Sequence, residues 1–372
     1  QPKLNFCGKS AVSKINGIIF IGNLEVNYVE FRKILVFQTW GIGDMVLSLP
    51  MLKALRENQP NAEITVIVGS SESASIAIGA GVCDRTAIFA PNKEGLLGVV
   101  RKFYGFRKQR FNLAIICTRL SVNYSRLLRL VSGIKTIAGD SIAPKPWPYS
   151  HWSEYDPASH RIQSNLKILN TLFDLGPVNN APTLSIDKEH QKTAEEIWKS
   201  WGLTEKRVLG IHPGSGISQG NVKRFPIAQY QEFVCDFLES YPDACVLVFI
   251  GPAEAGMTSF FEKLDKRVLV SEGFPLGLVV ALIKRLCVML AGDSGLAHIA
   301  SAIGTPVVTL AGPTRIEQTK PYGRGNIILR TPAKLDCMPC HGTPLFENCP
   351  FEIKCMKGIP TREMVNSLAS WF

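Results

Sequence analysis

Residues 291–314, AGDSGLAHIASAIGTPVVTLAGPT, combine a glycine-rich turn, an expected helix over 296–303 and an apolar strand over 307–310. A turn that opens a helix presents free N–H groups and the positive end of the helix dipole, which suit the oxygens of a diphosphate. Ser294 and His298 lie four residues apart, so they share one face of that helix. A helical histidine is often only a packed core residue, and this alternative stays open. The stretch predicts a diphosphate-binding turn.

A carboxylate follows the apolar strand expected over 34–37. Gly43 and Asp44 come soon after this strand, and Pro50 predicts that the next helix starts only near the proline. Val46 stands where a dinucleotide-binding fingerprint has its third glycine, which excludes that motif. Asp44 is therefore either a helix cap or a functional carboxylate at the carboxyl edge of a sheet.

Two further turns in the second half of the chain place polar groups after apolar strands. Ser215 and Gly216 offer a hydroxyl and backbone N–H groups to phosphate oxygens, and Lys223 offers a point charge to a leaving diphosphate. Glu254 follows the strand expected over 246–250, where a carboxylate can accept hydrogen bonds from two ribose hydroxyls. The alternative for both turns is a solvated polar loop.

Four of the ten cysteines cluster near the C-terminus: Cys337, Cys340, Cys349 and Cys355. A cluster that begins Cys-x2-Cys indicates a tetrahedral zinc or iron site, which would be structural because four thiolates leave no open position. The spacing matches no common zinc module, so a disulfide pair and free thiols remain alternatives. Several other cysteines lie inside apolar runs and are expected to be small buried residues in a reducing compartment.

These motifs resemble, in the same order, those of glycosyltransferase family 9, the bacterial ADP-heptose:lipopolysaccharide heptosyltransferases, over about residues 33–366. The resemblance implies that Asp44 is the general base that deprotonates the acceptor hydroxyl. It also implies a set of donor-binding residues, with Asp293 on the sugar hydroxyls: Ser215, Gly216, Lys223, Glu254, Asp293, Ser294, Gly295 and His298. Gly292 departs from the family, which often carries Asn or Thr before the aspartate.

The resemblance implies inverting transfer of heptose from ADP-L-glycero-β-D-manno-heptose to the inner core of lipopolysaccharide. No Asp-x-Asp pair occurs that would hold a divalent cation, so catalysis is expected to need no metal or other cofactor. One alternative is a family member that uses another nucleotide sugar or a protein acceptor. Another is a non-catalytic protein that only binds a nucleotide sugar.

The net charge of +10 favours anionic partners, although it also fits solubility alone. A basic, aromatic cluster over 101–110 suits either a membrane surface or a solvated helix. The candidate acceptor-binding residues are Gly43, Arg101, Lys102, Arg107, Lys108 and Arg119. No apolar run reaches the roughly 18 residues that span a bilayer. We expect a cytoplasmic protein on the inner membrane of a Gram-negative bacterium, with lipopolysaccharide core or lipid A as acceptor and no nucleic-acid partner.

Alternating strands and helices position these residues. Two such series predict an α/β protein with two Rossmann-like domains facing each other across a cleft, the GT-B arrangement. The expected units are an N-terminal extension (1–32), an acceptor domain (33–178), a nucleotide-sugar domain (179–345) and a C-terminal tail with a helix (346–372). The tail is expected to pack back on the acceptor domain.

Overall fold

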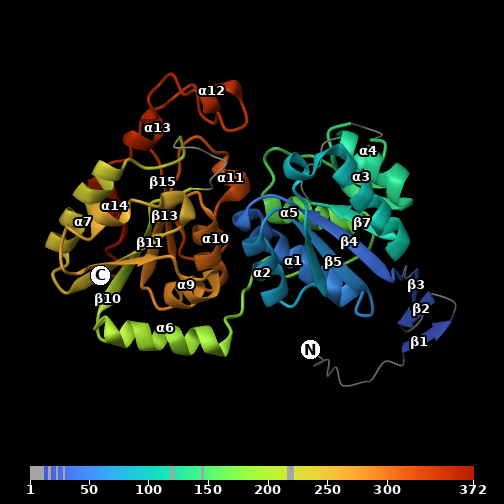
Figure 1. Ribbon diagram of the computed structural model, residues 1–372, viewed down its shortest axis with the longest axis horizontal. Helices are drawn as coiled ribbons and strands as arrows, with labels where there is room; N and C mark the ends of the chain where they lie inside the picture. Colours follow the sequence, from blue (N-terminus) through green and yellow to red (C-terminus); the bar gives the residue numbers. More distant parts are fainter. Residues whose placement is uncertain are drawn as a thin grey trace, which may run out of the picture.

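The computed structural model describes residues 30–117, 120, 122–143, 146–215 and 222–372, together with the backbone of three short strands near the N-terminus. The three strands pair antiparallel in chain order: β1 (Val12–Ile15), β2 (Ile18–Ile21) and β3 (Leu24–Asn27). They lie at one end of the molecule, beside the first large domain (Figure 1).

The first large domain contains a parallel six-stranded sheet in the order β6-β5-β4-β7-β8-β9. Its strands are β4 (Lys33–Gln38), β5 (Glu63–Val68), β6 (Arg85–Ile88), β7 (Leu113–Ile116), β8 (Thr136–Ser141) and β9 (His151–Glu154). Its helices are α1 (Ile42–Asn58), α2 (Ser71–Gly79), α3 (Pro91–Gln109), α4 (Val122–Ser132) and α5 (Arg161–Asn170). Alternate residues of β4 enter two different cores, so the sheet is covered on both faces.

The second large domain repeats this order, β12-β11-β10-β13-β14-β15, again with all neighbours parallel. Its strands are β10 (Arg207–His212), β11 (Ala244–Ile250), β12 (Val268–Glu272), β13 (Val288–Gly292), β14 (Val307–Leu310) and β15 (Ile327–Leu329). Its helices and turns are α6 (Lys188–Ser200), α7 (Ile227–Ser240), η2 (Pro252–Glu254), α8 (Thr258–Phe261), α9 (Leu276–Ile283), α10 (Gly295–Ala302) and α11 (Ile316–Thr319). Two doubly wound domains confirm the predicted GT-B arrangement (Figure 1).

Helix α1 starts eight residues earlier than the sequence predicts. Pro50 lies inside it, and Gly41 is its N-cap without a side-chain hydrogen bond, so Asp44 is a first-turn residue rather than a cap. A proline in a helix removes one hydrogen bond and costs about 3 kcal/mol. An unbroken run of buried residues from Met45 to Leu52 packs this helix between the domains, and that burial outweighs the cost.

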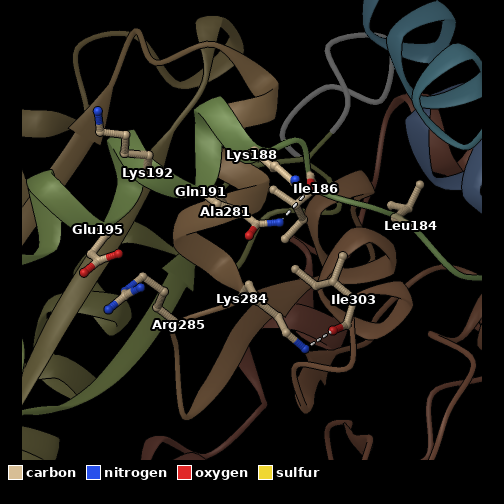
Figure 2. A pocket seen from close by; sticks show the side chains of 10 residues that line it. All are labelled: Leu184, Ile186, Lys188, Gln191, Lys192, Glu195, Ala281, Lys284, Arg285 and Ile303. Carbon is tan, nitrogen blue, oxygen red and sulfur yellow. Dashed lines mark hydrogen bonds between the residues drawn. The ribbon is translucent and has the colours of Figure 1, made fainter.

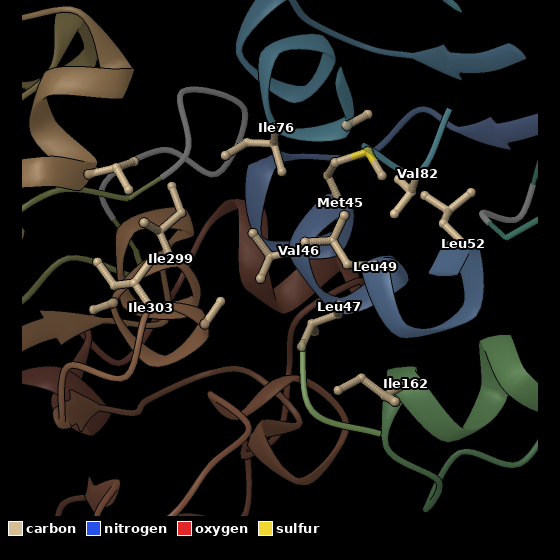
Figure 3. Close-up of a cluster of buried hydrophobic side chains, with 14 of the residues drawn as sticks. Met45, Val46, Leu47, Leu49, Leu52, Ile76, Val82, Ile162, Ile299 and Ile303 are labelled. Carbon is tan, nitrogen blue, oxygen red and sulfur yellow. The ribbon is translucent and has the colours of Figure 1, made fainter. Parts of the chain in front are cut away.

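One apolar cluster joins the two domains. Figure 3 shows side chains of α1, among them Val46 and Leu49, in the same buried cluster as Ile299 and Ile303 around α10. Polar contacts lie beside this core: Nε2 of His160 donates to the carbonyl oxygen of Lys320 at 3.0 Å. The domains therefore meet through the helices that follow the central strands β4 and β13.

The C-terminal tail packs on the second domain, and the prediction that it packs on the first is wrong. It holds α12 (Pro344–Glu347), α13 (Lys354–Lys357) and α14 (Thr361–Ser367). Helix α14 contacts α7 and β15, and its buried Met364, together with Leu368, enters the core of the second domain. The chain end follows the same core, where Phe372 stacks edge-on against Phe237 at 4.9 Å. In the described part of the chain, no helix is long and apolar enough to cross a membrane.

Candidate active site

Asp44 lies half-buried in the first turn of α1, directly after the central strand β4. A buried polar network holds this turn. Gln38 Nε2 donates to the backbone oxygen of Asp44 at 3.2 Å, and Ser48 Oγ donates to the same oxygen at 2.8 Å. Asn165 of α5 donates to Ser48 Oγ at 3.0 Å. The network therefore fixes the backbone that carries the carboxylate, relative to both β4 and α5.

The second domain brings an ion pair to the same junction. Lys223 Nζ lies 3.1 Å from Oδ2 of Asp293, and His298 Nε2 lies 3.7 Å from its Oδ1. Asp293 follows β13, and His298 lies in the first turns of α10, which packs against α1. The ring of His298 lies against Gly43, the neighbour of Asp44. The structure thus brings together Asp44, Lys223, Asp293 and His298, which sequence analysis drew from both halves of the chain.

The pKa values of the two carboxyl groups at this junction are shifted in opposite directions. Burial raises the pKa of Asp44 above its ordinary value, although the charges of Arg161 and His298 act against the rise. Burial also acts to raise the pKa of Asp293, but His298 and Lys223 outweigh it and hold that pKa well below its usual range. A carboxylate with a raised pKa is the better proton acceptor, so Asp44 suits a general base and Asp293 suits a permanent anion.

Glu254 is buried inside the second domain. Its Oε1 accepts a hydrogen bond from Arg224 Nη2 at 2.8 Å, and its Oε2 lies 3.7 Å from Nε2 of His212. Nδ1 of His212 in turn lies 3.0 Å from Oγ of Ser294, so the predicted ribose and diphosphate residues form one continuous chain. Ser215 is also buried, and its neighbour Gly214 lies against Glu254, whereas the predicted Gly216 lies outside the described residues.

Arg161 and Trp40 belong to the site but escaped the sequence analysis. The guanidinium of Arg161, the first residue of α5, stacks over the ring of Trp40 at 4.9 Å. The supporting Gln38 and Ser48 were also missed. Gln38 carries the only local signal, because it is the one amide that ends the apolar run ILVF. An arginine at the start of an amphipathic helix carries no such signal.

The predicted basic acceptor residues do not reach Asp44. Arg101, Lys102, Arg107 and Lys108 lie on α3, which packs on the core formed by Phe37 and Phe103. Helix α1 packs on the opposite face of the sheet. Lys102 is further engaged, since its Nζ donates to the carbonyl oxygen of Ile88 at 2.7 Å. The predicted Arg119 lies outside the described residues.

The four clustered cysteines form no metal-binding group in the described part of the chain. Cys340 and Cys355 are buried and Cys337 and Cys349 are half-buried, all as free thiols. Among the residues that the structure describes, no three cysteine, histidine or acidic side chains converge as ligands. Burial raises the pKa of Cys355 to about 11, with a smaller contribution from the neighbouring thiols. The four cysteines lie close enough together to raise the pKa of Cys355, and they are present as free thiols, one of the alternatives that the sequence left open.

A cavity of about 580 Å³ lies apart from these residues, between helix α9 and α6 with the segment that leads into α6 (Figure 2). Four basic side chains and one acidic side chain line it together with apolar residues: Lys188, Lys192, Lys284, Arg285 and Glu195. Lys284 Nζ donates to the carbonyl oxygen of Ile303 at 2.6 Å and so caps the C-terminal end of α10. The cavity therefore borders the far end of the helix whose first turns carry His298.

Comparison with known proteins places these features in a family. The model of glycosyltransferase family 9 (heptosyltransferase) matches residues 109–349. Lipooligosaccharide heptosyltransferase 2 of Campylobacter jejuni serotype O:6 is 27% identical over 172 residues, which are 44% of this chain and 51% of that protein. The chain thus spans about half the length of the curated relatives that it matches.

Solved structures share the whole fold at low sequence identity. A family 9 glycosyltransferase from Veillonella parvula has a TM-score of 0.75 and 19% identity, covering 92% of this chain and 98% of that one. The E. coli ADP-heptose lipopolysaccharide heptosyltransferase II has a TM-score of 0.67 and 17% identity, with coverages of 91% and 98%. The iron-containing dodecameric glycosyltransferase TibC of E. coli has a TM-score of 0.57 and 13% identity, with coverages of 94% and 78%.

Proposed function

The chain belongs to glycosyltransferase family 9, the heptosyltransferase family, and from this premise we propose that it transfers heptose from ADP-L-glycero-β-D-manno-heptose to an inner-core sugar of lipopolysaccharide. The observation that carries the proposal is the meeting of Asp44 with the Asp293–Lys223 pair between the two domains. A proton acceptor from one domain thereby faces a charged, hydroxyl-binding group from the other.

The proposed donor occupies the second domain. Lys223 and the N-terminal end of α10 supply positive potential for the diphosphate, and Asp293 accepts hydrogen bonds from the heptose hydroxyls. Nδ1 of His298 is buried and has no hydrogen-bond partner among the described residues, so it is available to a bound sugar or phosphate. Related solved structures hold ADP or ADP-D-beta-D-heptose, which supports an ADP-linked donor here.

The proposed reaction is a single in-line displacement. Asp44 takes the proton of the acceptor hydroxyl as its oxygen forms a bond to the anomeric carbon, and the bond from that carbon to the phosphate oxygen breaks. ADP leaves with the electron pair of the broken bond, and attack from the opposite side inverts the configuration. Lys223 and the dipole of α10 stabilise the charge on ADP, which is the task that a divalent cation performs where an acidic pair holds one.

Helix α3 supports a proposed position at the cytoplasmic face of the inner membrane. It exposes Leu96 and Leu97, at 66% and 81%, on the same helix as the exposed Arg101, Tyr104 and Lys108. Apolar and basic side chains on one exposed helix suit an anionic lipid surface. Sedimentation with anionic vesicles at low salt tests this: Leu97→Glu is expected to abolish binding, and absence of binding by the wild type would contradict it.

ADP release from ADP-heptose in the presence of heptose-deficient lipopolysaccharide tests the reaction. We expect acceptor-dependent turnover that Asp44→Ala lowers by at least about 100-fold. Turnover only with UDP-N-acetylglucosamine would show that the donor is that nucleotide sugar. Turnover only with a protein acceptor would show that lipopolysaccharide is not the acceptor. Absence of turnover with every donor and acceptor would favour a protein that binds nucleotide sugars without catalysis.

A further inference from the structure

Arg161 is a buried cation without a direct ion pair in the described part of the chain. The residue is 8% exposed, and its Nε is fully buried without a hydrogen-bond partner. Within the described part of the chain, its guanidinium forms no ion pair with a carboxylate oxygen at 4.0 Å or less. A buried charge without a partner is costly, because the protein must remove it from water without compensation. Such a residue points to an anion that the site receives.

The surroundings of Arg161 add to its positive potential. Arg161 opens the ten-residue helix α5, whose positive dipole end lies at the same place. His160 caps this helix, with Nδ1 accepting from the backbone nitrogen of Ile162 and Nε2 donating to the carbonyl oxygen of Lys320. Both ring nitrogens of His160 are therefore engaged elsewhere, so His160 does not accept a hydrogen bond from Arg161.

Trp40 packs against the guanidinium. The guanidinium carbon of Arg161 lies over the ring, 4.9 Å from its centroid, so the aromatic face covers one side of the cation. Trp40 itself is 37% exposed, so the pair has an opening to solvent. A planar fork of N–H donors with a fixed plane matches two oxygens of a carboxylate or phosphate.

The pair belongs to the acceptor side of the junction. Trp40 stands in the connection between β4 and α1, and Arg161 opens α5, so both belong to the first domain. Lys223 and Asp293, the proposed donor residues, belong to the second domain. Asp44 is close enough to both groups for the charges of Arg161 and Lys223 to act on its pKa.

We propose that Arg161 and Trp40 bind an anionic group, a carboxylate or phosphate, on the acceptor sugar beside the hydroxyl that Asp44 deprotonates. The inference rests on the proposed function of this site, and it adds the residues that select a charged acceptor. Binding energy from this remote anion would position the hydroxyl against Asp44, so its loss lowers kcat/KM for the acceptor and leaves donor binding unchanged.

Acceptor selectivity tests the proposal. Heptose-deficient lipopolysaccharide is compared with the same material after removal of phosphate and, separately, after reduction of carboxyl groups to alcohols. One of these treatments is expected to lower wild-type kcat/KM by at least about 10-fold, which identifies the anion. Arg161→Gln is expected to lower kcat/KM on the untreated acceptor by about the same factor. The treatment should then lower its kcat/KM no further, and its KM for ADP-heptose should stay unchanged.

Three controls separate selectivity from damage to the fold. Arg126→Gln removes an exposed arginine that stacks over another tryptophan, Trp147, at 5.7 Å, and it is expected to keep wild-type selectivity. Trp40→Leu removes the stack at a partly exposed position, so it is expected to fold and to lose part of the selectivity. Arg161→Lys keeps a charge but not the fork, and it is expected to recover only part of the loss.

Two outcomes would overturn the inference: an equal loss on all three acceptors in Arg161→Gln and Trp40→Leu, or an increase in KM for ADP-heptose instead of the acceptor. Calorimetric titration of the three acceptor preparations without donor distinguishes failure of the anion subsite from failure of the proposed transfer reaction. Anion-dependent binding that Arg161→Gln removes, without turnover of any donor, would uphold the subsite and reject the reaction. Anion-independent binding would reject the subsite.

Discussion

His298 of α10 lies directly against Gly43 of α1: a methyl group at residue 43 would stand 2.6 Å from Cδ2 of the histidine. The reverse contact is nearly as tight, because a methyl group at Gly295 would stand 3.0 Å from Cβ of Ile42. Two glycines thus let the first turns of two helices from different domains meet. Their contact is the reason that Asp44 and Asp293 share one site.

Gly43→Ala is expected to lower kcat/KM by at least about 10-fold, because His298 or the whole of α10 must move away from α1. Helix α1 should tolerate the change, since alanine is a better helix former than glycine. Steady-state kinetics and thermal unfolding check both parts. Gly41→Ala is the matched control, because a methyl group there meets no atom within 4 Å. Equal activity of the two variants would show that the contact is not needed for catalysis.

Asp44→Asn is expected to lower kcat by at least about 100-fold while ADP binding stays near that of the wild type. The amide keeps the size of the side chain but cannot take a proton from the acceptor. Rapid-quench measurement of ADP formation, with calorimetric titration of ADP, separates the two quantities. A comparable loss of ADP affinity would instead assign Asp44 to donor binding.

Activity is expected to fall on the acid side at a pH above the ordinary carboxyl value of 3.8, because burial raises the pKa of Asp44. Asp44 must be ionised to act, so kcat/KM declines as the pH drops through this raised pKa. Arg161→Gln removes the largest of the charges that lower this pKa, so the acid limb should move to still higher pH. The pH profile of kcat/KM, which reports the free enzyme, checks the direction. An unshifted limb in the variant would contradict the assignment of that limb to Asp44.

Lys223→Met is expected to lower kcat by about 100-fold or more, because the leaving ADP loses a point charge. It should also destabilise the fold, since it leaves Asp293 as a buried anion without its partner at 3.1 Å. Adding Asp293→Asn should restore stability but not activity, which separates the two roles. Lys263→Met, at an exposed lysine of the same domain, is the control. Full recovery of activity in the double variant would make the pair purely structural.

Much of this site could be predicted from local sequence. The strand–turn–helix units around Asp44 and Asp293 are continuous in the chain, so their turns show the polar residues that end at the sheet edge. Partners that meet only through folding left no such signal. Arg161 reaches Trp40 because α5 packs on α1, and nothing near residue 161 indicates that contact.

The errors in the prediction have the same origin. Rules based on neighbouring residues take no account of burial against parts of the chain that are distant in sequence. Pro50 indicated the start of a helix, yet α1 begins at Ile42 and continues past the proline, because it is packed between the two domains. The tail helix α14 was expected on the first domain, but the second domain holds an apolar site for Met364 beside α7. For the four clustered cysteines the sequence left metal, a disulfide pair and free thiols open, and the described residues show free thiols.

Glu254→Gln is expected to lower the free energy of unfolding by about 3 kcal/mol, because it breaks a buried ion pair and removes the carboxylate charge that Arg224 faces. Exchange of Glu317→Gln, in an exposed pair with Arg330 at 3.2 Å, should cost less than about 1 kcal/mol. Urea unfolding of both variants checks this contrast. Equal small losses would show that Glu254 is not held as a buried ion.

The same variant tests the predicted contact of Glu254 with the ribose. Arg224→Gln breaks the same ion pair from the other side, so it reproduces the structural damage without removing the carboxylate. If the carboxylate accepts hydrogen bonds from ribose hydroxyls, Glu254→Gln should weaken ADP binding about 10-fold more than Arg224→Gln does. Calorimetric titration with ADP and with 2′-deoxy-ADP measures the difference, because loss of one hydroxyl should matter to the wild type and not to Glu254→Gln. Equal affinities of the two variants for ADP would confine Glu254 to holding the turn after β11.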